Sequence, residues 1–153
     1  MTEKIRNFLE ERRPDTPCLV VDLDVIAKNY RDLERVLPQA DIFYAVKANP
    51  AKEVLTTLLS LGAFFDTASI YEIESCLDIG ASPDRIAYGN TIKKARDIAS
   101  AFDHGIRLFA FDSGRFQWPA VRIGHVWNVT LESQATPLRL RTLSLRPSVF
   151  AME

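Results

Sequence analysis

The sequence lacks the features that mark several specialised classes of protein. Its 153 residues include 19 lysines and arginines and 20 aspartates and glutamates, a net charge of −1, so no charge excess indicates a nucleic-acid partner. No apolar run approaches the roughly 18 residues of a membrane span. The start, "MTEKIRNFLEERR", is too charged for a signal peptide. We therefore expect a cytoplasmic protein that contacts neither nucleic acid nor membrane.

Cysteine, histidine and glycine are also scarce. Cys18 and Cys76 lack the spacing of a metal or redox site. Each is expected to be a small buried hydrophobic residue rather than half of a disulfide, which fits a reducing cytoplasm. His104 and His125 have no partner at metal-ligand spacing, so surface or packing roles are expected and no metal site is predicted. The six glycines form no G-x-G-x-x-G or Walker-type phosphate loop.

The chain has an ordinary globular composition, but that composition changes near residue 113. With 47% hydrophobic and 25% charged residues, it is long enough for one modest core. Residues 1–113 carry 14 basic and 18 acidic side chains, whereas residues 114–153 carry five arginines, no lysine, two glutamates and both tryptophans. We therefore predict a folded domain over residues 1–113 and an atypical tail over residues 114–153.

The first forty residues show two helical patterns and one strand-like run. Residues 2–13 are expected to form a short helix that ends before Pro14. The apolar run from Cys18 to Val21 has the composition of a strand. An amphipathic helix is expected after it, and Asp22 or Asp24 could cap its start.

From residue 41 onward, predicted strands and helices alternate. Glycines at 62, 80 and 105 close the helices. This order is typical of right-handed βαβ units in a parallel sheet, so the predicted fold class is α/β. The strands are expected over residues 41–49, 63–69, 85–91 and 106–113, and the helices over 51–62, 70–80 and 92–105.

Polar side chains recur where these strands end. Ligands of barrels and open α/β sheets bind at the carboxyl edge of the strands, so four such strand ends in succession indicate a site. The residues are Lys47 on the first strand, Asp66 and Ser69 on the second, Tyr88 and Asn90 on the third, and Asp112 and Ser113 on the fourth.

Two interpretations of Lys47 stay open at this point. A lysine at a strand end commonly packs its stem on apolar surface and leaves its ammonium in water. Alternatively, the aromatic-rich run before it desolvates the ammonium and favours the neutral amine. A neutral amine can form a Schiff base with an aldehyde. That is the chemistry of pyridoxal phosphate (PLP), the electron sink for amino-acid decarboxylation and racemisation.

Asp66 also has two interpretations, because a carboxylate just before a helix either caps it or serves as an acid in the site. Ser69 suits the cap better, since Glu72 follows three residues later in capping-box spacing. That arrangement leaves Asp66 for the site.

The other strand-end residues are equally ambiguous. Tyr88 and Asn90 could line the pocket, but Asn90 or Thr91 could instead cap the third helix. Asp112 and Ser113 present the same choice between site and cap.

The tail does not continue the alternation. Prolines interrupt it and no amphipathic helix is recognisable, although stretches such as Val126–Leu131 are β-prone. We expect no fifth βα unit, and a poorly structured segment is favoured over a small subdomain.

Several of these segments together resemble a known family. The motifs are "TPCLVVDLDVIAKNY", "FYAVKANP", "LGAFFDTASIYEIE", "RIAYGNTIKK" and "LFAFDS". They are similar to the N-terminal part of the fold-type III PLP-dependent decarboxylases, and closer to the ornithine/lysine decarboxylases than to the diaminopimelate branch. The Gly-Gly-Glu-type sequence of that branch is absent, as is the Tyr-Gly-His-type stretch of alanine racemases.

The resemblance implies a fold, a cofactor and an activity. The fold would be the first four βα units of a (β/α)₈ barrel of the alanine racemase-like type. The cofactor would be PLP, bound as a Schiff base to Lys47 with Asp66 as a pocket residue beside it. Glu72, Tyr88 and Asn90 match positions around that pocket. The family activity would be decarboxylation of a basic amino acid, L-ornithine to putrescine in polyamine biosynthesis, by a homodimer.

The resemblance covers about residues 10–113. We therefore interpret the chain as an N-terminal fragment of an ornithine decarboxylase-like enzyme, expected to be inactive alone, with residues 114–153 frame-shifted or disordered. The family's phosphate loop and the acidic partner of the pyridine nitrogen have no counterpart in this sequence. The alternatives are a non-catalytic PLP-binding module and an inactive decoy fragment. Ornithine and lysine cannot be distinguished as substrates.

Overall fold

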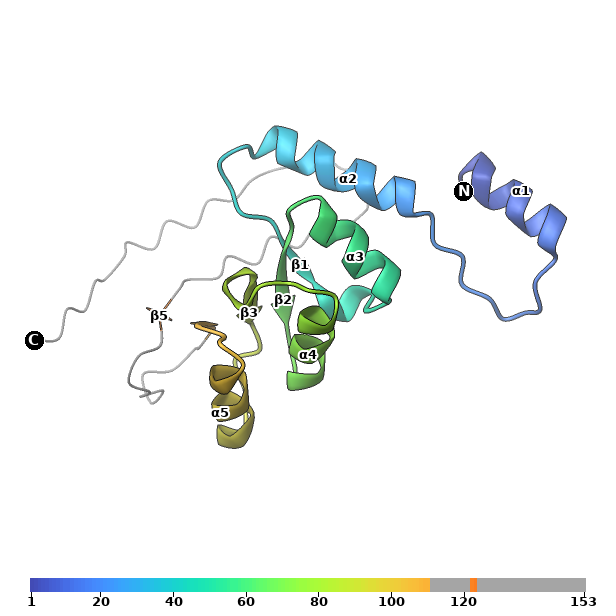
Figure 1. Ribbon diagram of the computed structural model, residues 1–153. Helices are drawn as coiled ribbons and strands as arrows, with labels where there is room; N and C mark the ends of the chain where they lie inside the picture. The colour runs from blue at the N-terminus through green and yellow to red at the C-terminus, as the bar shows by residue number, and fades with distance from the viewer. Residues whose placement is uncertain (111–121, 124–153) are drawn as a thin grey trace, which may run out of the picture.

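The computed structural model describes residues 1–110 and 122–123 as helices, strands and connections (Figure 1). Five α-helices and five short strands occur in these ranges, and a 3₁₀ turn follows β1 and another precedes β3. The helices are α1 (Glu3–Arg12), α2 (Leu23–Val36), α3 (Lys52–Ser60), α4 (Ile70–Asp78) and α5 (Ala95–Asp103). The strands are β1 (Phe43–Ala45), β2 (Phe64–Thr67), β3 (Ile86–Tyr88), β4 (Leu108–Phe109) and β5 (Arg122–Ile123), and the turns are η1 (Val46–Ala48) and η2 (Pro83–Arg85).

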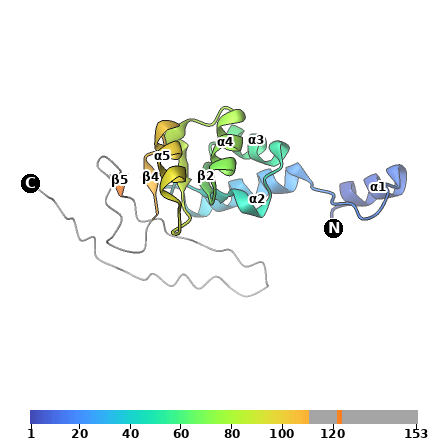
Figure 2. The ribbon, with the colours of Figure 1, turned by 90° about the horizontal axis from the view of Figure 1, so that it is seen from below.

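The strands form one parallel sheet in the order β1-β2-β3-β4-β5. Consecutive strands are therefore neighbours, and right-handed crossovers then place every connecting helix on the same face. Helices α3, α4 and α5 lie beside the sheet in this way (Figures 1 and 2). This is how a (β/α)₈ barrel begins, so the predicted α/β class and the predicted first barrel units are confirmed.

Strand β5 lies inside the predicted atypical tail, residues 114–153. It pairs with β4 in parallel, Leu108 opposite Arg122 and Phe109 opposite Ile123. The β-prone stretch Val126–Leu131 lies outside the described residues. So do Asp112, Ser113 and His125 and most of the predicted tail.

The core lies between the sheet and its helices. Phe65 of β2 is fully buried and belongs to one cluster with residues of α3, α4 and α5. Successive side chains of a strand point to opposite faces. Phe65 and Thr67 thus face the helices, whereas Phe64 and Asp66 face away from them. This alternation places Asp66 on the face that forms the interior of a barrel.

Three helices end as predicted, at Gly62, Gly80 and Gly105, each with a positive φ of 87–92°. At the end of α3, Gly62 N donates to Leu59 O (3.0 Å) and Ala63 N donates to Leu58 O (3.1 Å). These bonds satisfy carbonyls that the end of the helix leaves unpaired. The chain then turns directly into the next strand.

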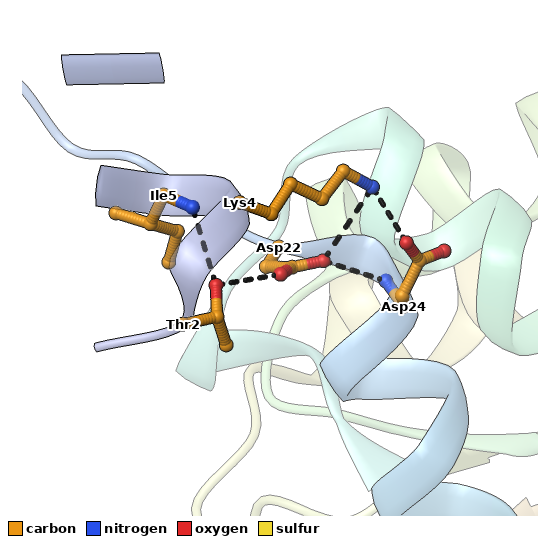
Figure 3. A network of polar contacts seen from close by, with 5 residues as sticks. All are labelled: Thr2, Lys4, Ile5, Asp22 and Asp24. Atoms are coloured by element: carbon orange, nitrogen blue, oxygen red, sulfur yellow. Dashed lines mark hydrogen bonds and ion pairs between the residues drawn. The ribbon is translucent and has the colours of Figure 1, made fainter. Parts of the chain in front are cut away.

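The predicted helix over residues 2–13 is confirmed as α1, and the predicted cap of α2 is Asp22 (Figure 3). Thr2 Oγ1 accepts a hydrogen bond from Ile5 N (3.2 Å) and donates to Asp22 Oδ2 (2.9 Å). Asp22 Oδ1 in turn accepts from Asp24 N (3.1 Å). The two helix starts are joined through one carboxylate, although α1 stands apart from the sheet (Figures 1 and 2).

Two predictions that concern residues 18–21 are wrong. The run from Cys18 to Val21 is not a strand, because no strand of the described sheet pairs with it, and Leu19 is 85% exposed. Cys18 is exposed rather than buried, while Cys76 is buried as expected and both thiols are free. Apolar composition alone does not bury a segment that has no partner strand.

Among residues 1–110 and 122–123, no helix is both long enough and apolar enough to cross a membrane.

Candidate active site

The carboxyl ends of β1, β2 and β3 bring four polar or small residues of the predicted motifs to one edge of the sheet. Lys47 lies in η1, directly after β1. Asp66 is the third residue of β2 and pairs with Ala45 on one side and Ala87 on the other. Gly89 and Asn90 follow β3. The predicted convergence of strand-end residues is therefore seen for the first three strands.

Lys47 is exposed, which agrees with the first interpretation, in which the ammonium lies in water, and not with the second. The strand is shorter than predicted because it ends at Ala45 and turns into η1, where the preceding Val46 is fully buried. The side chain is therefore accessible at the edge of the sheet. An accessible primary amine at this edge can reach a ligand that bears a carbonyl group.

Two polar contacts hold the turn that carries Lys47. Tyr44 Oη donates to Asn49 O (3.2 Å), and Asn49 Oδ1 accepts from Ala51 N (3.0 Å). The second bond satisfies a backbone donor at the start of α3, where Ala51 offers no side-chain cap. Asn49 therefore connects the end of β1 to the start of α3. Neither Tyr44 nor Asn49 was predicted from the sequence to support the site.

Asp66 is partly buried, and its two carboxylate oxygens have different surroundings. Oδ1 is buried and has no hydrogen-bond partner among the described residues. Burial raises the pKa of Asp66 above its ordinary value; Lys47 lowers this pKa, Glu72 raises it and Lys93 lowers it, in decreasing order. The influence of Lys47 shows that the amine and the carboxyl group share one electrostatic environment.

Ser69 and Glu72 cap α4, as the capping-box spacing predicts. Ser69 Oγ accepts from Glu72 N (3.3 Å), and Glu72 Oε2 accepts from Ala68 N (2.7 Å). The reciprocal bond goes to the residue before the cap rather than to the cap itself. Asp66 is thereby freed from capping.

Tyr88 and Asn90 do not line an open pocket. Tyr88 is 2% exposed and packs in the core, with its ring centroid 6.1 Å from that of Phe109. Asn90 is exposed, and its Nδ2 donates to Ala68 O (3.4 Å). Neither Asn90 nor Thr91 caps α5, since that helix begins only at Ala95.

Gly89 lies against the candidate site residue Asp66, and this contact was not predicted from the sequence. A Cβ atom at this position would lie 1.7 Å from Asp66 Oδ1. The signal in the sequence was a glycine inside the strand predicted over residues 85–91, which marks a close approach of backbone to another group. Its partner could not be inferred, because Asp66 lies on a different strand.

Other candidates show no sign of a site. His104 is exposed at the end of α5, and its Nε2 lies 3.8 Å from Glu74 Oε1. This agrees with the surface role expected for it. Within the part of the chain that the structure describes, no three His, Cys, Asp or Glu side chains are grouped so that they could hold a metal ion.

The described fold and the lysine at its ligand edge correspond to a known class of enzyme domain. Residues 23–116 match the family of pyridoxal-dependent decarboxylases, in its pyridoxal-binding domain. The protein belongs to this family, because the match covers more than half of the chain. The predicted resemblance is confirmed, and PLP is the cofactor of this family.

Individual relatives agree with the family. The lysine/ornithine decarboxylase of Selenomonas ruminantium is 42% identical over 112 residues, which are 73% of this chain and 28% of that protein. Antizyme inhibitor 2 of Xenopus laevis is 40% identical over 114 residues, which are 74% of this chain and 25% of that protein.

Solved structures show the same similarity in three dimensions. A crystal structure of the Selenomonas ruminantium lysine decarboxylase has a TM-score of 0.66 and 41% identity, over 74% of this chain and 30% of that one. The lysine/ornithine decarboxylase of Vibrio vulnificus, complexed with putrescine, has a TM-score of 0.66 and 34% identity, over 73% and 30% of the two chains. The chain thus spans 25–30% of the length of these relatives.

Proposed function

We propose that this chain carries the PLP-attachment segment of a decarboxylase that acts on a basic amino acid, with Lys47 as the attachment residue. The observation that carries the proposal is the placement of Lys47, an exposed amine in the turn after β1, within the region matched by the pyridoxal-binding domain. The described residues suit the cofactor, because an accessible amine lies near a buried carboxylate oxygen that has no hydrogen-bond partner among them.

Lys47 and Asp66 have different tasks in this proposal. The Lys47 amine would condense with the cofactor aldehyde, with release of water, and would hold the cofactor at the edge of the sheet. When bound, PLP withdraws electrons from the α-carbon of an amino acid and so makes loss of CO₂ possible. Asp66, whose pKa is raised by burial, keeps its proton to a higher pH than an ordinary carboxyl group does, and it lies in the electrostatic environment of Lys47.

The substrate is proposed from the relatives. The Vibrio vulnificus structure is described as a complex with putrescine, and a structure of the Selenomonas ruminantium enzyme as a complex with PLP and cadaverine. Both ligands are diamines, which are the decarboxylation products of ornithine and lysine. We favour L-ornithine to putrescine, as in polyamine biosynthesis, in a cytoplasmic homodimer.

Trapping the attachment residue tests this proposal. The chain is incubated with PLP, reduced with borohydride and digested, and the modified lysine is mapped by mass spectrometry. We expect the label on Lys47, its loss in Lys47→Ala and its retention in the matched control Lys52→Ala, which removes another exposed lysine nearby. A label spread evenly over the exposed lysines would contradict the proposal.

A non-catalytic PLP-binding module is the second candidate. It is favoured by the 40% identity to antizyme inhibitor 2, whose name describes an inhibitor rather than an enzyme. Release of CO₂ from carboxyl-labelled ornithine and lysine separates the two. Release that disappears in Lys47→Ala supports the decarboxylase, whereas a Lys47 adduct without CO₂ supports the binding module. Absence of any adduct contradicts both.

A further inference from the structure

The carboxyl group of Asp66 occupies the space that a side chain at position 89 would fill. A Cβ atom on Gly89 would lie 1.7 Å from Oδ1, 2.7 Å from Cγ and 3.1 Å from Oδ2 of Asp66. Non-bonded carbon atoms are in favourable contact at about 3.5–4.0 Å. Only glycine at position 89 is therefore compatible with the observed position of this carboxyl group.

Hydrogen bonds between β2 and β3 hold the backbone on both sides of this contact. Gly89 N donates to Thr67 O (2.8 Å), and Thr67 Oγ1 donates to Ala87 O (2.7 Å) in the buried part of the sheet. Asp66 also pairs with Ala87 in the parallel register. Because these bonds fix the separation of β2 and β3, a side chain at position 89 would displace the Asp66 carboxyl group rather than the strands.

We propose that Gly89 is a positioning residue: the recess it leaves holds the Asp66 carboxyl group at the site edge and so sets where that group lies relative to Lys47. The contact between Gly89 and Asp66 is independent of the cofactor. Only the consequence for Lys47 rests on the function proposed above.

The charged groups around Asp66 predict what happens when the recess is filled. They are Lys47 after β1, Glu72 on α4 and Lys93 beyond β3. Burial, which raises the pKa of Asp66, has a larger effect on this pKa than any of the three charges. A carboxyl group expelled from the recess would be more exposed to water. The pKa of Asp66 is then expected to fall toward its ordinary value.

A carboxyl-carbon NMR titration of the full chain without PLP tests this expectation. Spectra of ¹³C-labelled protein are compared for wild type, Gly89→Ala and the control Asn90→Ala, and Asp66→Asn identifies the Asp66 signal. We expect a lower pKa for Asp66 in Gly89→Ala and an unchanged one in Asn90→Ala, which removes only an exposed bond to Ala68 O. A titration of Gly89→Ala identical to wild type would overturn the proposal.

A double-variant cycle tests the steric part separately. Gly89→Ala should lower the urea midpoint of unfolding when Asp66 is present and have little effect in Asp66→Ala, which lacks the colliding atoms. If Gly89→Ala fails to fold, recovery of folding in Asp66→Ala/Gly89→Ala supports the contact. An equal fall of the urea midpoint on Gly89→Ala in wild type and in Asp66→Ala would overturn the proposed contact.

These measurements need no cofactor. Their failure would leave the PLP-trapping result at Lys47 unaffected, and a failed trapping experiment would leave the contact between Asp66 and Gly89 intact.

Discussion

The side chains of Ser69 and Glu72 accept hydrogen bonds from two backbone N–H groups at the start of α4: Ser69 Oγ accepts from Glu72 N at 3.3 Å, and Glu72 Oε2 accepts from Ala68 N at 2.7 Å. Ser69 lies between β2 and α4, three residues beyond the partly buried Asp66, and Glu72 lies in the first turn of α4. Because Ser69 and Glu72 cap the helix, Asp66 is not required as a cap and can face the candidate site.

Replacing Ser69 with alanine is expected to destabilise the chain by about 1 kcal/mol, the usual cost of losing an N-cap. Urea unfolding followed by circular dichroism measures the change. Ser75→Ala is the matched control, because Ser75 Oγ only donates to Tyr71 O within the same helix. Equal effects of the two substitutions would argue against the cap as the source of the loss.

Asp66→Asn is expected to become more stable relative to wild type as the pH rises. Burial raises the pKa of Asp66 in the folded chain above 3.8. At a pH between 3.8 and the raised pKa, Asp66 holds a proton in the folded chain and releases it in the unfolded chain. This contribution to stability is present at low pH and is lost as the pH rises through the window.

Urea unfolding of wild type and Asp66→Asn, from about pH 4 to about pH 7, measures this difference. The pKa values of Asp22 and Asp32 are lowered by their hydrogen bonds to Thr2 and Lys28, and both carboxylates occur in both proteins. Their opposite pH dependence therefore cancels in the comparison. A stability difference independent of pH would contradict the raised pKa.

The two cysteines are expected to react very differently in the folded chain. Burial raises the pKa of Cys76 to about 12, and its side chain is fully buried, whereas Cys18 is exposed. Since the thiolate is the reactive form, iodoacetamide near neutral pH should modify Cys18 and spare Cys76. Mass spectrometry reads the sites, and unfolding in urea should make both react. Equal rates in the folded chain would show that the core around Cys76 opens readily.

Phe65→Ala is expected to cost about 3–5 kcal/mol, because a fully buried aromatic ring is lost from the core between β2 and the helices. Ile92→Ala is the control: this side chain is 83% exposed, so its truncation should change stability by less than about 0.5 kcal/mol. Urea midpoints and slopes give both values. A small loss at Phe65 would mean that the described sheet is not the stabilising core.

Local features of the site were predictable because they depend on neighbours along the chain. The cap of α4 followed from the spacing of Ser69 and Glu72, and the helix ends followed from glycines that adopt a positive φ. The run from Cys18 to Val21 was predicted wrongly, because its β-like composition contained no information about a partner strand. Lys47 was correctly placed at a strand end, but its exposure depended on where β1 turned into η1.

The sequence by itself determined the order of the elements, the parallel α/β class and the family, since periodicity, capping residues and motifs are properties of contiguous segments. Only the tertiary structure decided that Asp66 turns away from the helices and that its carboxyl group fills the recess at Gly89. These two residues lie on neighbouring strands and meet through the register of β2 and β3. That register depends on the packing of the whole sheet against its helices, which no single segment specifies.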